Sequence, residues 1–129
     1  MTTPSASEPV VVDSSGWLEY ITADKNANLF APYIESSGPL LVPVIVLYEV
    51  RKILLLRQTS LLADIFVSHA LRRQVIAIDE KIALAAVSIS IDGQLAMADA
   101  LLYATARVYD AHFVTSDSHF KNLPDVTLI

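Results

Sequence analysis

Residues 9–16, PVVVDSSG, are the part of the chain on which the interpretation of its fold depends. Three consecutive β-branched residues are typical of a buried strand, and the polar Asp-Ser-Ser-Gly sequence that follows indicates a turn. Further short apolar runs predict strands at residues 40–42, 75–78, 112–115 and 126–129. Because these runs do not alternate with polar residues, they predict strands that are buried on both faces, as in a parallel sheet.

The segments between the predicted strands have helical patterns. Helices are expected at residues 17–22, 26–37, 45–58, 60–73, 80–89 and 95–111, with Ser14 or Ser15, Ser60 and Asp79 as N-caps and Pro32 interrupting the second helix. The alternation of strands and helices predicts a three-layer α/β fold with a five-stranded, mostly parallel sheet between helices. We expect a flexible tail over residues 1–8 and one domain over residues 9–129.

The composition excludes several classes of protein. The 129 residues include no cysteine, which excludes disulfides, thiolate zinc sites and cysteine nucleophiles. The longest apolar run, residues 40–48, contains Pro43 and is too short for a membrane helix, and the N-terminus does not resemble a signal peptide. We therefore expect a cytoplasmic protein. Its mean hydropathy of +0.48 suggests a partner or an oligomer, and its net charge of −5 argues against a general nucleic-acid binder.

Four acidic residues occupy informative positions. Asp13 directly follows the first predicted strand and Asp117 closely follows the fourth, although acids are also common in loops and helix caps. Glu49 and Asp99 have mostly apolar neighbours three and four positions away on their helices. A surface pair of Glu49 with Lys52 is an alternative, as is a salt-bridged or protonated Asp99 in the core.

The expected topology brings these acids together. The carboxyl ends of parallel strands lie at one edge of the sheet, where ligands bind in such folds. If the second and fourth strands flank the first, Glu49 and Asp99 can reach the ends of the first and fourth strands. Clustered carboxylates favour a cation, and oxygen ligands suit Mg²⁺ or Mn²⁺. Such an ion supports hydrolysis of a phosphodiester.

Four motifs then give the chain a family resemblance. They are VVDSS at residues 11–15, PVIVLYEV at 43–50, MADAL at 97–101 and VTSDSHF at 114–120. In this order they resemble the PIN-domain nucleases and, among them, the VapC-type toxins of toxin–antitoxin pairs. The resemblance implies a PIN-like fold and a Mg²⁺- or Mn²⁺-dependent endoribonuclease that hydrolyses RNA phosphodiesters by metal-activated water.

The resemblance also implies roles for individual residues. The catalytic residues would be Asp13, Glu49, Asp99 and Asp117, with Asp13, Asp99 and Asp117 as metal ligands and with Ser14 and Thr115 orienting the carboxylates. The implied partners are an RNA substrate, a cognate antitoxin and a second copy of the chain in a homodimer. No membrane is implied, and DNA would be bound only through the antitoxin. Whether His119 contributes to the site stays open.

Three other functions are considered. A signalling receiver domain also has five parallel strands, but the chain lacks an acidic pair at residues 13–14 and a lysine after the last strand. A phosphatase with a nucleophilic Asp13 would need a second aspartate two positions later, where Ser15 stands. A PIN-like binding module without activity is the third, and the presence of all four acids does not favour it.

Overall fold

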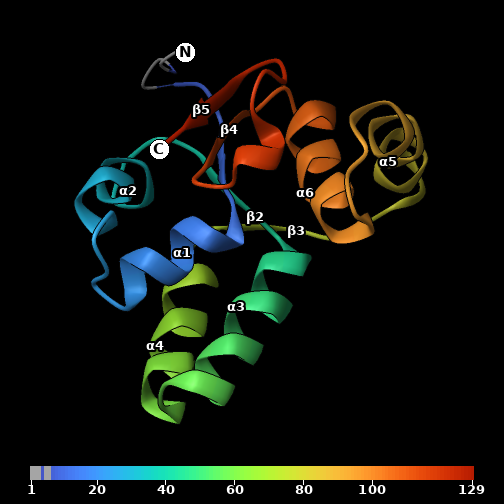
Figure 1. Cartoon of the computed structure of the whole chain (residues 1–129). Coiled ribbons are helices and arrows are strands. Elements are labelled where there is room, and N and C mark those ends of the chain that lie inside the picture. Colours follow the sequence, from blue (N-terminus) through green and yellow to red (C-terminus); the bar gives the residue numbers. More distant parts are fainter. Residues whose placement is uncertain (1–3, 5–6) are drawn as a thin grey trace.

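The computed structural model describes residue 4 and residues 7–129, so most of the predicted tail over residues 1–8 lies outside the described residues. Within the described part, five strands form one parallel sheet in the order β3-β2-β1-β4-β5 (Figure 1). The strands are β1 (Val10–Val12), β2 (Leu40–Pro43), β3 (Gln74–Ile76), β4 (His112–Thr115) and β5 (Val126–Leu128). The predicted five-stranded parallel sheet is confirmed, and β2 and β4 flank β1 as the convergence of the acids requires.

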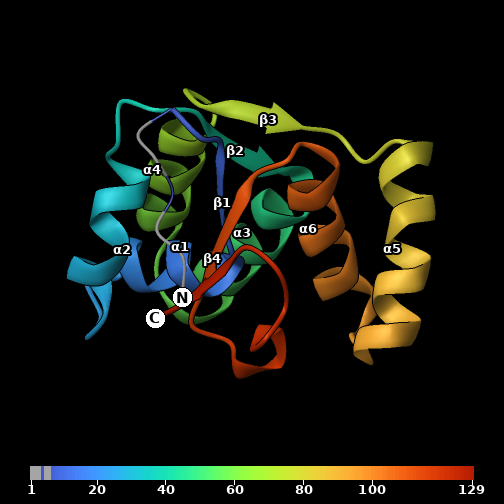
Figure 2. The ribbon, with the colours of Figure 1, turned by 90° about the horizontal axis from the view of Figure 1, so that it is seen from above.

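Helices cover both sides of the sheet. They are α1 (Ser14–Ile21), α2 (Ala27–Ile34), α3 (Val44–Arg57), α4 (Ser60–Ala70), α5 (Glu80–Gly93) and α6 (Met97–Val108), with a 3₁₀ turn, η1, at Ser118–Phe120. Figure 2 shows α1, α2 and α4 on one side of the strands, and α6 with α5 beyond it on the other. Among the described helices, none alone is long and apolar enough to cross a membrane; only α5 and α6 together pass that test, across a bend of 118°.

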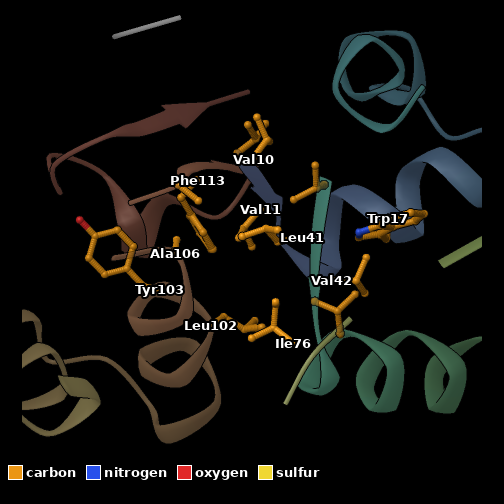
Figure 3. Close-up of a cluster of buried hydrophobic side chains, with 14 of the residues drawn as sticks. Val10, Val11, Trp17, Leu41, Val42, Ile76, Leu102, Tyr103, Ala106 and Phe113 are labelled. Atoms are coloured by element: carbon orange, nitrogen blue, oxygen red, sulfur yellow. The ribbon is translucent and has the colours of Figure 1, made fainter. Parts of the chain in front are cut away.

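The central strand β1 anchors the core. Its Val11 is fully buried and lies opposite Leu41 of β2 on one side and Phe113 of β4 on the other. Trp17 of α1 and Leu102 of α6 pack against opposite faces of these strands (Figure 3). Burial of these apolar side chains therefore fixes the position of β1 within the sheet, and with it the position of Asp13, which follows the strand.

The close approach of α1 to β1 depends on Gly16. A Cβ atom at this position would lie 2.5 Å from the Phe30 ring and 2.6 Å from the Val12 side chain. Glycine is therefore required here for packing, since no other residue avoids these contacts. The first turn of α1 consequently sits directly against the end of β1.

Two predicted helix caps are wrong. Asp13, not Ser14 or Ser15, is the N-cap of α1, and Thr59, not Ser60, is the N-cap of α4. An N-cap residue needs an extended backbone, which Asp13 and Thr59 have, whereas all three serines already lie inside their helices. The predicted cap Asp79 is confirmed, since its side chain accepts a hydrogen bond from the Ile82 N–H.

The strand order excludes a receiver domain. Receivers and other flavodoxin-like proteins have the order 2-1-3-4-5, in which the third strand lies beside the first. Here β3 is at the edge of the sheet, beyond β2. The strand that follows β1 in space is instead β4, which brings Thr115 and Asp117 next to Asp13.

Candidate metal centre

Asp13 is held rigidly at the end of β1. One carboxylate oxygen accepts a hydrogen bond of 2.8 Å from the Ser14 N–H. The other accepts one of 2.8 Å from the Thr115 hydroxyl and a longer one of 3.3 Å from the Ser15 hydroxyl. The side chain is only 4% exposed. Three residues, two at the start of α1 and one at the end of β4, therefore fix this carboxylate, and the sequence did not predict the Ser15 contact.

Thr115 joins Asp13 to Asp117. β4 runs parallel to β1, so the ends of the two strands lie side by side. While its hydroxyl donates to Asp13, Thr115 Oγ1 accepts a hydrogen bond of 2.9 Å from the Asp117 N–H. The contact between Thr115 and Asp13 agrees with the orienting role expected for Thr115. Asp117 itself is the N-cap of η1.

Glu49 enters the site from the second turn of α3. Its Oε1 accepts a hydrogen bond of 2.7 Å from the Ser14 hydroxyl, so Ser14 contacts the carboxylate it was expected to orient. The alternative surface pair with Lys52 does not form; Lys52 Nζ lies 3.5 Å from the Tyr48 hydroxyl instead. Because Ser14 is inside α1 and is not its cap, its side chain is available for this contact.

Asp99 is half-buried in the first turn of α6. Within residue 4 and residues 7–129, no side chain or backbone group donates a hydrogen bond to it, and no cation forms a salt bridge with it. The alternative of a salt-bridged core acid is therefore excluded for the described part of the chain. An acid without a partner at such a place is typical of a ligand-binding position.

The four acids influence one another electrostatically. Burial raises the pKa of Asp13 to about 6, and the charges of Asp99 and Glu49 add to this, against the hydrogen bonds from Thr115 and Ser14. Burial also raises the pKa of Asp99, followed by the charges of Asp117 and Glu49, whereas His119 lowers it. The predicted convergence therefore occurs: acids from the ends of β1 and β4 and from α3 and α6 repel one another.

A smaller group within this cluster has the spacing of a metal site. One ligand atom each from Asp99, Asp117 and His119 lies within 4.8 Å of the others. Opposite ligands of an octahedral ion with bonds of about 2.1 Å are about 4.2 Å apart, so one ion fits among them. Asp13, an expected ligand, is outside this group, and its oxygens accept hydrogen bonds instead.

His119 is the residue that sequence reasoning did not assign. Its position two residues after Asp117 was the only available signal. The 3₁₀ turn folds this short interval back on itself, and the His119 N–H donates a 2.9 Å hydrogen bond to Asp117 Oδ1. His119 Nδ1 lies 3.0 Å from the same oxygen. Such a contact depends on local backbone geometry that no residue pattern specifies.

The chain is similar to known proteins in sequence and in fold. The PIN domain family model matches residues 10–126. None of the curated proteins matches the sequence. A toxin–antitoxin complex from Klebsiella pneumoniae contains a chain with a TM-score of 0.76 and 19% identity, covering 92% of this chain and 95% of that one.

Two further solved structures have the same fold. VapBC2 from Rickettsia felis, bound to a DNA fragment from its promoter, gives a TM-score of 0.73 at 15% identity and covers 94% of this chain and 97% of that one. VapC20 from Mycobacterium tuberculosis is described as a toxin that cleaves the sarcin–ricin loop. It gives a TM-score of 0.71 at 16% identity and covers 86% of this chain and 92% of that one. At such identities these similarities show the fold.

Proposed function

Because this chain belongs to the PIN domain family, we propose that it is a metal-dependent endoribonuclease and the toxin of a VapBC-type toxin–antitoxin pair. The observation that carries this proposal is the gathering of four acids from four separate elements at one edge of the sheet, where burial and, to a smaller extent, the acidic neighbours raise the pKa values of Asp13 and Asp99. Carboxylates so close together repel one another, and a bound cation relieves that repulsion. Clustered acids with shifted pKa values are therefore typical of functional sites.

The contacts of each residue indicate its role in binding the cation. Asp99 and Asp117 have the spacing to hold the cation, and within the described residues the Asp117 carboxylate is contacted only at its Oδ1. Asp13 and Glu49 add negative charge beside them. Thr115 and Ser14 keep the last two carboxylates in place. A divalent cation bound there would supply an activated water and neutralise charge on the phosphoryl group. The chain itself supplies a preformed arrangement of oxygen ligands that suits Mg²⁺ or Mn²⁺.

The first test of this function is the metal requirement of cleavage. We expect the purified protein to cut single-stranded RNA internally with Mg²⁺ or Mn²⁺ and to lose at least about 100-fold in rate in excess EDTA, as removal of the charge-neutralising group requires. Gel analysis of end-labelled RNA measures this. Binding of RNA with no cleavage under any metal would support the alternative of a silent PIN-type binding module.

RNA binding has to overcome the negative charge of the site. Some of the basic residues are engaged elsewhere: Arg51 forms a salt bridge of 3.0 Å with Asp64, and Arg73 donates to two backbone carbonyls at the C-terminal end of α2 and just beyond it. Lys52 forms no salt bridge with any described residue. It follows Glu49 by three residues and so lies about 60° from it around α3. Lys52 would therefore contact a phosphate of RNA bound at the acids.

Lys52→Ala is expected to raise the KM for RNA about fivefold and to leave kcat within about twofold, because one phosphate contact is lost outside the reacting group. The dependence of log KM on log salt concentration should fall by about 0.7, the value for one contact to a single strand. Steady-state kinetics at several salt concentrations measure both. Lys81→Ala on α5 is the matched control, and an equal effect there would contradict the assignment.

The exposed apolar residues support a protein partner. One set lies on α3 and α4 and consists of Tyr48, Leu55, Leu56, Leu61 and Ile65, and the other, on α5 and α6, consists of Leu84, Val87, Ile91 and Met97. We propose that a cognate antitoxin and a second copy of the chain cover these surfaces in the cytoplasm. The toxin–antitoxin complexes with the same fold support the antitoxin as a partner, and two of them are described as bound to DNA. We propose that this chain contacts DNA only through its antitoxin.

A further inference from the structure

His119 lies at the open side of the acidic cluster. It is the middle residue of η1, and its imidazole is 75% exposed while its Nδ1 points at Asp117 Oδ1 from 3.0 Å. The ring is largely exposed, but its Nδ1 faces the acids. Among the described residues, this is the one histidine that joins a group with the spacing of a metal site.

The spacing of the donor atoms agrees with ligation of one ion. Adjacent ligands of an octahedral ion with bonds of about 2.1 Å are about 3.0 Å apart, and opposite ligands are about 4.2 Å apart. The separation of 3.0 Å between His119 Nδ1 and Asp117 Oδ1 equals the first distance. The Asp99 oxygen lies within 4.8 Å of the other two donor atoms, a range that includes the second distance. One nitrogen and two oxygens could then bind the same ion without rearrangement of the backbone.

We propose that His119 is a direct nitrogen ligand of the divalent cation and biases the site toward transition-metal ions over Mg²⁺. This inference rests on the proposed metal-dependent function and adds to it the identity of the ion. Mg²⁺ prefers oxygen ligands and retains its waters, whereas imidazole binds later first-row ions such as Co²⁺ much more strongly. A site made of carboxylates alone favours Co²⁺ over Mg²⁺ less strongly. The ligand set of this chain is therefore Asp99, Asp117 and His119.

A merely structural role for His119 predicts something different. If His119 only orients Asp117 by a hydrogen bond, its loss lowers the affinity for every cation to a similar extent, because the position of the carboxylate affects all of them alike. If His119 is a ligand of the ion, its loss lowers the affinity for Co²⁺ strongly and the affinity for Mg²⁺ little. The ratio of the two dissociation constants therefore separates the two roles without any measurement of cleavage.

The experiment is calorimetric titration of the full chain with Mg²⁺, Mn²⁺ and Co²⁺ at one pH. His119→Gln is expected to weaken Co²⁺ at least about tenfold, Mn²⁺ by less, and Mg²⁺ less than twofold. The visible absorption spectrum of bound Co²⁺ should change as a nitrogen ligand is lost. His69→Gln on α4 is the control for adventitious binding of Co²⁺ to imidazole, and it should leave the ratio unchanged.

The outcomes are distinct. An unchanged ratio of Co²⁺ to Mg²⁺ affinity in His119→Gln, with an unchanged spectrum, overturns the ligand assignment. If the wild-type chain still binds Mg²⁺ and cleaves RNA in that case, the proposed function stands without it. If the wild-type chain binds no divalent cation, both proposals fail together.

Discussion

Asp99→Asn is expected to lower kcat/KM for RNA cleavage by about 100- to 1,000-fold and to leave the fold intact. The amide keeps the size of the side chain but loses the charge that would hold the cation. No described residue makes a hydrogen bond or salt bridge with Asp99, so the substitution breaks no contact within the described protein. Cleavage kinetics give the rate, calorimetry gives the loss of metal affinity, and circular dichroism gives the melting temperature.

The stability of Asp99→Asn separates a functional acid from a structural one. Burial and then the charges of Asp117 and Glu49 raise the pKa of Asp99, so its ionised form is unfavourable in the folded chain. We therefore expect the melting temperature without metal to stay the same or rise. Asp92→Asn, at an exposed position near the end of α5, is the control and should leave cleavage unchanged. Normal cleavage by Asp99→Asn, or a large drop in its stability, would refute the assignment.

The acids could be found from the sequence because each violates a local expectation. Asp99 interrupts an apolar helix face, and Asp13 ends a strand that must be buried. Parallel topology then requires the strand ends to meet, so Asp13 and Asp117, which are 104 positions apart, could be placed at one edge without a structure. The contacts of Ser14 with Glu49 and of Thr115 with Asp13 agree with the resemblance that suggested orienting roles.

Other features depend on geometry that residue patterns do not encode. The cap of α1 was misplaced because only one residue separates strand from helix: Asp13 follows β1 directly and also caps α1. The predicted helix over residues 95–111 is shorter, Met97–Val108, since Ala96 is extended. His119 contacts Asp117 only because the 3₁₀ turn is tighter than an α-helix. Residue patterns do not predict the direction of a side chain within so short a turn.

Asp13 provides the second large effect, on stability. Burial, with the charges of Asp99 and Glu49 as smaller causes, raises its pKa from 3.8 to about 6. The folded chain therefore binds this proton more tightly than the unfolded chain. The contribution of Asp13 to the free energy of unfolding is greatest below about pH 4, falls as the pH rises through 6, and is constant above that. At 1.36 kcal/mol per pKa unit, the loss is roughly 3 kcal/mol.

Asp13→Asn is expected to remove this pH dependence and to raise the free energy of unfolding at pH 7.5 by about 1–3 kcal/mol without metal. The gain is below the full value because an amide has one acceptor oxygen where the carboxylate has two, so the hydrogen bonds from Ser14 and Thr115 cannot both be kept unchanged. Urea unfolding of both proteins in EDTA, at pH 5 and 7.5, measures the difference. Groups common to both proteins, such as His69, cancel in it.

The matched control is Asp79→Asn. Asp79 is also a helix N-cap and accepts a hydrogen bond of 2.9 Å from the Ile82 N–H, but it is exposed. Since asparagine caps helices about as well as aspartate, the free energy of unfolding of Asp79→Asn should differ from that of the wild type by less than about 0.5 kcal/mol at either pH. A gain at Asp13 but not at Asp79 would show that the chain gives up stability to keep a buried negative charge beside Asp99. Equal effects at both caps, or a less stable Asp13→Asn at pH 7.5, would show that the carboxylate is retained for folding, and the argument for a cation held by clustered anions would lose its energetic basis.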